Sequence, residues 1–299
     1  MKNKHEVIGF LFAFITTAIW SGNFVVARSV YETIPPVSLS FFRWSLAIIV
    51  ILPFALKPLI AERDIVKKNL PYLSVTSLLG ITMFSTLIYI ASHTTAAINL
   101  SLICITFPVF IVILSRIFYH EKITLYKGIG IILVAIGVIL LISKGNPSRL
   151  LKISFSVGDI WALIGAISFA LYSILLKHKP KQLNFWAFQS SLFILGIIFL
   201  FPFFVIEYIK TPTVNFDDKM ILSIFYVSIL VSIVGYALWN KAVEKIGPYR
   251  TGITYYTSPL FSGLWAYIFL KEEISMLHFY SGLLILSGII ISNYSSRRR

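Results

Sequence analysis

The sequence predicts an all-α membrane protein of ten transmembrane helices, arranged as two inverted five-helix repeats around a central cavity. Three observations lead to this fold class: the apolar composition, the number and length of the apolar stretches, and a repetition of the first half of the chain in the second. Of the 299 residues, 58% are hydrophobic and only 13% are charged, which is too apolar for an ordinary soluble domain. The chain is therefore expected to lie in a lipid bilayer.

Ten apolar stretches have, or nearly have, the ~20 residues that a helix needs to cross ~30 Å of hydrocarbon. They lack the period-two alternation of a membrane barrel, and backbone groups in lipid must bond within their own segment, so helices are expected. The first stretch lacks a small-residue cleavage site and is interpreted as a retained anchor. The expected spans are 7–27, 36–56, 70–91, 96–118, 126–143, 158–177, 184–206, 220–240, 249–270 and 276–294.

The basic residues alternate in number from one gap between spans to the next. The two termini and the gaps on their side, with the adjoining span ends, hold 18 of the 26 Lys and Arg residues; the other gaps hold 7, and Arg43 lies inside the second span. Positive charge in short loops marks the cytoplasmic side, so both termini are expected in the cytoplasm. Because topology accounts for the net charge of +14, nucleic-acid binding is not expected.

The second half of the chain repeats the first. An offset of 151 residues superposes identical residues without a gap, and a weaker match at 149 pairs Ala13 with Ala162 and Arg28 with Lys177. The identities at 151 are Ala91 with Ala242, Thr106 with Thr257, Pro108 with Pro259, Phe110 with Phe261, Phe118 with Phe269, Glu121 with Glu272, Ile123 with Ile274 and Gly137 with Gly288.

An odd number of spans in each copy decides how the copies are related. Since each copy holds five spans, the second copy enters the membrane from the opposite side, and a pseudo-twofold axis lies in the membrane plane. The expected domains are residues 8–143 and 158–294, joined by a linker at 144–157. Inverted repeats of this kind are typical of secondary transporters.

Short motifs stand at several places in the spans and at their ends. They are Trp20, Ser21, Gly22, Asn23 and Phe24; Phe42 with Arg43; Thr106, Phe107 and Pro108, followed by His120, Glu121, Lys122, Ile123 and Thr124; and Thr257, Ser258 and Pro259, followed by Lys271, Glu272, Glu273, Ile274 and Ser275. Together with the ten spans and the repeat, they resemble the EamA branch of the drug/metabolite transporter superfamily over nearly the whole chain. The resemblance implies a ten-helix basket around a central cavity, a bacterial inner-membrane location, and transport of amino acids or other small metabolites, often outward. It does not specify the solute.

Arg43 is the one charge expected deep inside a span. It lies about seven residues from the outer end of its helix, roughly 10 Å deep at 1.5 Å per residue. A structural interpretation has the side chain snorkel outward or pair within the protein. A functional interpretation has it face the cavity and hold an anionic group such as a carboxylate.

Amides, hydroxyls and amphipathic rings within the spans are the other candidates for binding a solute. Each of them is also able to join helices in lipid, so the two roles stay open for any single residue, and Asn23 is the first choice for a ligand. With Arg43, the candidates are Asn23, Tyr89, Asn99, Ser101, Tyr172, Gln189, Tyr236, Trp239, Asn240, Tyr255 and Tyr256.

Two prolines and two glutamates occupy equivalent positions in the repeat. Pro108 and Pro259 are expected in mid-helix, where a proline removes a backbone hydrogen bond, and they are interpreted either as fixed kinks or as hinges. Glu121 and Glu272 are interpreted either as part of an interfacial turn, with Thr124 or Ser275 capping the next helix, or as gate residues.

Three classes of function are compatible with a polytopic membrane protein. A secondary transporter or facilitator of small solutes fits the repeat and the polar residues in the spans. An enzyme is disfavoured because no zinc-helix, G-x-S-x-G or paired-aspartate motif occurs, so we expect no catalytic residue, metal site or cofactor. A channel is disfavoured because nothing resembles a filter loop. The expected partners are a small-molecule solute and the lipid bilayer, and a homodimer is left open.

Overall fold

Most of the residues that the structure describes are helical, and none of them lies in a β-strand. The computed structural model describes residues 2–30, 33–95, 100, 103–121, 124–143, 145–146, 148, 156–211, 217–270 and 276–294. Seven helical segments among these residues are long and apolar enough to cross a membrane, and Phe107–Tyr119 and Leu125–Leu141 are apolar but shorter. The protein is therefore an all-α, multi-pass membrane protein.

The first half of the chain contains a long run of helix in its third expected span. The π-helix η1 interrupts this run, which extends from Leu70 to Thr94. The elements are α1 (Lys2–Val30), α2 (Pro36–Ala61), α3 (Arg63–Lys68), α4 (Leu70–Ser77), η1 (Leu78–Met83), α5 (Phe84–Thr94), α7 (Phe107–Tyr119) and α8 (Leu125–Ile142).

The second half repeats the order of the long helices, with small differences in the short ones between them. Its π-helix, η3, lies in the run that corresponds to the third span of the first half. The elements are α10 (Val157–Leu175), η2 (Leu176–His178), α11 (Phe185–Lys210), α12 (Asp218–Phe225), η3 (Tyr226–Gly235), α13 (Tyr236–Thr254), η4 (Tyr255–Thr257), α14 (Ser258–Leu270) and α15 (Met276–Tyr294).

One helical segment is long enough to include two of the expected spans. It runs from Met220 to Trp265, 46 residues, more than twice the ~20 that cross the hydrocarbon once. The backbone breaks inside it at Gly247, where φ is 81° and ψ is 161°. A positive φ of this kind is readily adopted only by glycine. The eighth expected span ends before this break, and the ninth follows it.

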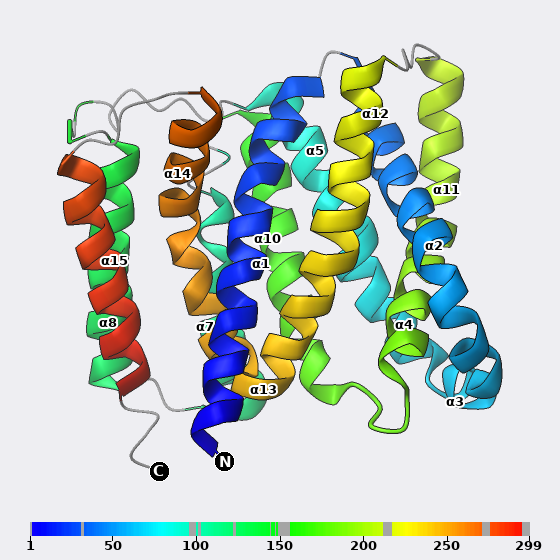
Figure 1. Cartoon of the computed structure of the whole chain (residues 1–299), viewed down its shortest axis with the longest axis horizontal. Coiled ribbons are helices and arrows are strands. Elements are labelled where there is room, and N and C mark those ends of the chain that lie inside the picture. Colours follow the sequence, from blue (N-terminus) through cyan, green and yellow to red (C-terminus); the bar gives the residue numbers. More distant parts are fainter. Residues whose placement is uncertain are drawn as a thin grey trace.

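The helix bounds repeat at the offsets found in the sequence. Pro36–Ala61 and Phe185–Lys210 are separated by 149 residues at both ends, and Phe107–Tyr119 and Ser258–Leu270 by 151 at both ends. In Figure 1, α2 descends toward the side where both termini lie, whereas α11 rises from that side. Equivalent helices pack on each other, since α2 packs against α11 at one end of the molecule and α8 against α15 at the other.

Polar side chains fix several helix starts. The Asn184 side chain accepts a hydrogen bond from the Trp186 N–H (2.8 Å), and the Asp217 carboxylate accepts one from the Met220 N–H (2.7 Å). Thr124 caps α8 by accepting from the Lys127 N–H, as the sequence predicted. These bonds satisfy N–H groups that have no partner within the helix.

Pro108 and Pro259 do not lie in mid-helix, and that prediction was wrong. Each is the second residue of its helix, α7 or α14. A turn at Ile105 and Thr106 precedes α7, and the 3-10 turn η4 precedes α14. The first helical turn tolerates proline because its N–H groups lack intrahelical partners. Both prolines therefore stand in the first turn of an α-helix, and Pro259 does so where the 3-10 turn η4 passes into α14.

Glu207, near the end of α11, caps the N-terminus of α2. Its carboxylate accepts hydrogen bonds from the Val37 N–H (3.1 Å), the Ser38 N–H (2.6 Å) and the Ser38 hydroxyl (2.8 Å). We predict that Glu207→Ala lowers the free energy of unfolding by about 1–2 kcal/mol, because a lost cap typically costs this much. The measurement is the thermal midpoint in detergent. Glu207→Gln keeps a carbonyl acceptor and should lose less; an unchanged midpoint in Glu207→Ala would contradict the capping role.

Candidate functional site

Aromatic side chains from both halves fill the centre of the molecule. Trp20 on α1 and Phe169 on α10 are equivalent at the offset of 149, and their ring centroids lie 5.3 Å apart. Trp20 also stacks on Trp239 at 5.1 Å, and Trp44 meets Tyr236 edge-on at 5.2 Å. Equivalent residues of the two halves therefore meet in one buried aromatic cluster.

Arg43 of α2 lies beside this cluster with only 3% of its surface exposed. Its Nε donates a hydrogen bond to the Ser232 hydroxyl (2.6 Å), its Nη1 donates to the Tyr89 hydroxyl (2.9 Å), and its Cζ lies 4.7 Å from the centroid of the Trp44 ring. No carboxylate in the described ranges lies within 4.0 Å of it. Arg43 is therefore a buried cation whose described partners are all neutral.

Arg43 borders a small cavity between the two halves. The cavity has a volume of about 30 Å³, which is room for no more than a few water molecules. Five of its lining residues were predicted as solute ligands: Asn23, Arg43, Tyr89, Tyr236 and Tyr255. The others are Trp20, Phe84, Ser85, Ile88 and Val231.

A tyrosine and an asparagine form a hydrogen-bonded pair in each half. The Tyr89 hydroxyl donates to Asn23 Oδ1 at 3.4 Å, and the Tyr172 hydroxyl donates to Asn240 Oδ1 at 2.7 Å. Asn23 is equivalent to Tyr172 at the offset of 149, and Tyr89 is equivalent to Asn240 at 151. The same pair thus occurs twice with its two residues exchanged.

The second pair extends to Gln189 and lies outside the lining of the Arg43 cavity. Asn240 Nδ2 donates to Gln189 Oε1 at 2.9 Å. Gln189 is fully buried, and its Nε2 has no hydrogen-bond partner among the described residues. A buried amide without a partner is costly, so this network is less than fully satisfied in the present conformation.

The two π-helices accept hydrogen bonds across the boundary between the halves. The Tyr236 hydroxyl donates to the Gly80 carbonyl in η1 (2.6 Å), and Trp20 Nε1 donates to the Val231 carbonyl in η3 (3.0 Å). Gly80 and Val231 are again equivalent at 151. Gly80 is required here, because a Cβ atom on it would lie 2.2 Å from the Tyr172 ring. The two π-helices therefore join the two halves of the chain at the aromatic centre.

The remaining predicted residues lie elsewhere or outside the described part of the chain. Tyr256 packs in a separate apolar cluster with Tyr249 and Ile285, and Trp239 donates to the Ser173 hydroxyl (3.1 Å) within the aromatic centre. Asn99, Ser101 and Glu272 are outside the described residues.

Glu121 forms ion pairs that join the two halves. Its carboxylate lies 3.5 Å from Lys127 Nζ in α8 and 4.0 Å from Lys177 Nζ in η2. Lys177 Nζ also lies 3.8 Å from the centroid of the Tyr119 ring. The turn that follows α7 is thus tied to the end of α10 near the membrane surface.

Sequence reasoning did not identify several residues around Arg43. Trp20 was visible as part of a motif, but Trp44 and Phe84 read as ordinary apolar residues of a span. Ser232 carries no signal, because serines in membrane helices commonly bond to their own backbone or to a neighbouring helix. Among the described residues, no three His, Cys, Asp or Glu side chains converge in a way that could hold a metal ion.

Comparison with known protein families identifies the family of this chain. The model of the EamA-like transporter family matches residues 7–143 and 156–294. An uncharacterized transporter of Archaeoglobus fulgidus is 26% identical over 93% of this chain and 94% of its own length, and the uncharacterized transporter YyaM of Bacillus subtilis is 24% identical over 94% and 95%. A crystal structure shares the fold with a TM-score of 0.75 at 16% identity, covering 97% of this chain and 99% of that one. The chain belongs to the EamA-like transporter family and is a membrane transporter.

Proposed function

We propose that the chain is a secondary transporter of a bacterial inner membrane that moves small carboxylate-bearing metabolites, such as amino acids, by alternating access. In this proposal both termini lie in the cytoplasm, and the activity is export or facilitated equilibration. The observation that carries the proposal is the buried Arg43 guanidinium, which borders a cavity between the halves and has neutral described partners.

The chemistry of Arg43 favours an anionic solute group. A guanidinium has five N–H donors, and its two hydrogen bonds in the structure go to hydroxyl groups. A buried charge in lipid is stabilised by an opposite charge or is costly to keep. A carboxylate is planar and able to accept two parallel bonds from a guanidinium, so it would provide an opposite charge that the described residues do not supply at this position.

The size of the cavity supports a mechanism in which the protein moves. Sites for small molecules are commonly ~300 Å³ or more, whereas this cavity holds about 30 Å³. A solute would therefore enter only after the two halves separate on one side. We assign the present conformation to a closed state of the cycle.

The repeat supplies the second conformation that alternating access requires. We propose that the two halves form an inverted repeat of ten helices, and the opposite directions of α2 and α11 in Figure 1 support this arrangement. The exchanged Tyr–Asn pairs support it too, since one pair borders the cavity and its equivalent is packed away from it. In the opposite conformation the two pairs would exchange these environments.

Counterflow in liposomes tests the transport mechanism. Protein in liposomes that contain unlabelled amino acid should take up labelled amino acid faster than protein in empty liposomes, because a loaded carrier returns in exchange. Uptake that neither saturates nor accelerates would indicate a channel, and chemical conversion of the solute would indicate an enzyme.

The Tyr172 hydrogen bond is expected to help keep the terminus side of the molecule closed. Gln189, which joins this network, lies in the first turns of α11, on the side of the two termini. Tyr172→Phe should raise amide hydrogen exchange in residues 170–178 and 185–192 by up to about tenfold, since one buried hydrogen bond contributes ~0.5–1.5 kcal/mol. Tyr89→Phe is the matched control and should leave these segments unchanged. Equal exchange in both variants and the natural protein would contradict the closing role.

A further inference from the structure

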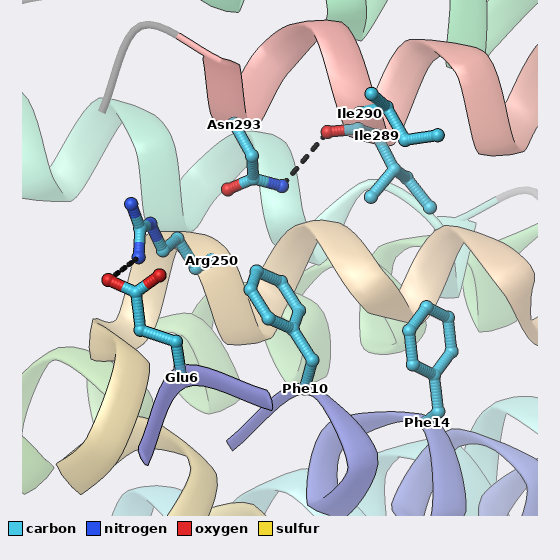
Figure 2. Close-up of a pocket in the computed structure, with 7 residues that line it drawn as sticks. All are labelled: Glu6, Phe10, Phe14, Arg250, Ile289, Ile290 and Asn293. Carbon is cyan, nitrogen blue, oxygen red and sulfur yellow. Dashed lines mark hydrogen bonds and ion pairs between the residues drawn. The ribbon is translucent and has the colours of Figure 1, made fainter. Parts of the chain in front are cut away.

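A groove of about 250 Å³ lies between α1, α13 and α15, on the side of the molecule where the two termini lie. Figure 2 shows its lining residues, which are Glu6, Phe10, Phe14, Arg250, Ile289, Ile290 and Asn293. α1 belongs to the first half and α13 and α15 to the second, so the groove crosses the boundary between the halves. It is separate from the Arg43 cavity and shares no lining residue with it.

The groove is polar at one end and apolar at the other. Glu6, Phe10 and Phe14 follow one another at four-residue intervals on one face of α1, about 6 Å apart along the axis. On α15, Asn293 lies one turn from Ile289 toward the chain end. The polar residues are therefore nearer the membrane surface on the terminus side, and the apolar residues are deeper. A phospholipid in that leaflet has the same order of polar and apolar groups.

The polar end carries charges of both signs. Arg250 Nη1 lies 3.2 Å from Glu6 Oε1, and the side chains are 12% and 34% exposed. This ion pair uses one nitrogen of the guanidinium, which has further N–H donors for an anionic group. The Glu6 carboxylate in the same place disfavours a ligand that carries negative charge alone.

Asn293 adds a hydrogen-bond acceptor that has no described donor. Its Nδ2 donates to the Ile289 carbonyl at 2.9 Å, and this bond fixes which way the amide is turned. Its Oδ1 is buried and accepts no hydrogen bond from the described residues. A buried acceptor without a donor is costly, so the site favours a ligand that brings an N–H or O–H group.

We propose that this groove binds a phospholipid with a primary-amine headgroup, of the phosphatidylethanolamine type. Its phosphate pairs with Arg250, its ammonium donates to Glu6 and to Asn293 Oδ1, and an acyl chain lies on Phe10, Phe14, Ile289 and Ile290. A choline headgroup has the same charges but no N–H donor. A glycerol headgroup has hydroxyl donors but no cation for Glu6. Only the primary amine matches all three polar groups at once.

The test compares three lipids with identical acyl chains, carrying ethanolamine, choline or glycerol headgroups, on the full-length protein in detergent. Binding is measured by native mass spectrometry and by the thermal midpoint. The ethanolamine lipid should bind at least about tenfold more tightly than the choline lipid, because choline makes neither of the two charge-assisted hydrogen bonds to Glu6 and Asn293. Equal binding of these two lipids would overturn the proposal, and so would preferential binding of the glycerol lipid.

Two variants locate the binding to this groove. Glu6→Gln and Asn293→Leu should each remove most of the preference for ethanolamine over choline. The matched control is Glu244→Gln, which removes one exposed carboxylate of α13 that does not line the groove and should keep the preference. A preference that survives both Glu6→Gln and Asn293→Leu would contradict the site. Transport is not part of this readout, so the proposal stands or falls independently of the proposed function.

Discussion

Arg43→Gln is expected to reduce binding of carboxylate-bearing solutes by about 30-fold to 1,000-fold. Loss of one partner from a buried, hydrogen-bonded charge pair costs about 2–4 kcal/mol, and each 1.4 kcal/mol corresponds to a factor of ten. The measurement is the rise of the thermal midpoint with amino acid concentration, followed by counterflow for any amino acid that raises it. Arg43→Lys keeps the charge but not the planar pair of donors, and it should lose less.

The same substitution separates the ligand role of Arg43 from a structural one. Without solute, Arg43→Gln should leave the midpoint unchanged or raise it, because it removes a buried charge that has only neutral described partners. An amino acid should raise the midpoint of the natural protein more than the corresponding amine without a carboxylate does. The two compounds should raise the midpoint of the variant equally. A midpoint that falls by several degrees, with solute discrimination intact, would mean that Arg43 is structural.

Gly288→Val is expected to lower the free energy of unfolding by about 2–3 kcal/mol. A Cβ atom at Gly288 would lie 2.7 Å from the Gly130 carbonyl oxygen and 2.9 Å from the Val134 nitrogen. These are backbone atoms of α8, so the clash can be relieved only if α8 and α15 move apart. The measurement is the thermal midpoint in detergent, read by size-exclusion chromatography after heating.

Gly128→Val is the matched control for this substitution. Gly128 lies on α8 two residues from Gly130, and a Cβ atom there would have no neighbour within 4 Å. The control should shift the free energy of unfolding by less than about 0.5 kcal/mol, as surface substitutions usually do. If both variants lost stability equally, close packing of α8 on α15 would not be the cause.

The sequence was sufficient to predict an all-α, multi-pass membrane protein and much of the helix pattern. The offsets of 149 and 151 residues, found from residues such as Gly137 and Gly288, recur in the bounds of α2 and α11 and of α7 and α14. The sequence offsets and the helix bounds are expected to agree because a membrane helix extends over the apolar run that crosses the hydrocarbon. Apolar runs that repeat in the sequence therefore give helices that repeat in the structure. Five predicted ligands also line one cavity, since polar residues in spans are rare enough to be informative.

The contacts around Arg43 were beyond prediction because they depend on which helix faces touch. Ser232 is one of several serines in its span, and only packing shows that it accepts from Arg43. Pro108 was expected in mid-helix since its neighbours are apolar on both sides, and nothing in the pattern marks the turn before it. The exchange of Tyr and Asn between the two hydrogen-bonded pairs was also missed. Comparing the halves by identical residues gives no weight to positions where Tyr in one half is matched by Asn in the other.

If the halves rearrange as proposed, the two π-helices, η1 and η3, are where the backbone is expected to change. A π turn contains one residue more than an α-helix needs for the same rise, and a helix with such a surplus can slip by one position while its ends stay anchored. A slip of one residue rotates the side chains it passes by about 100°. Gly80, Val231 and Ser232 lie within these turns, directly beside the aromatic centre. We therefore expect the backbone to change register by one residue at the π-helix of each half. The prolines at the starts of α7 and α14 are expected to keep their positions.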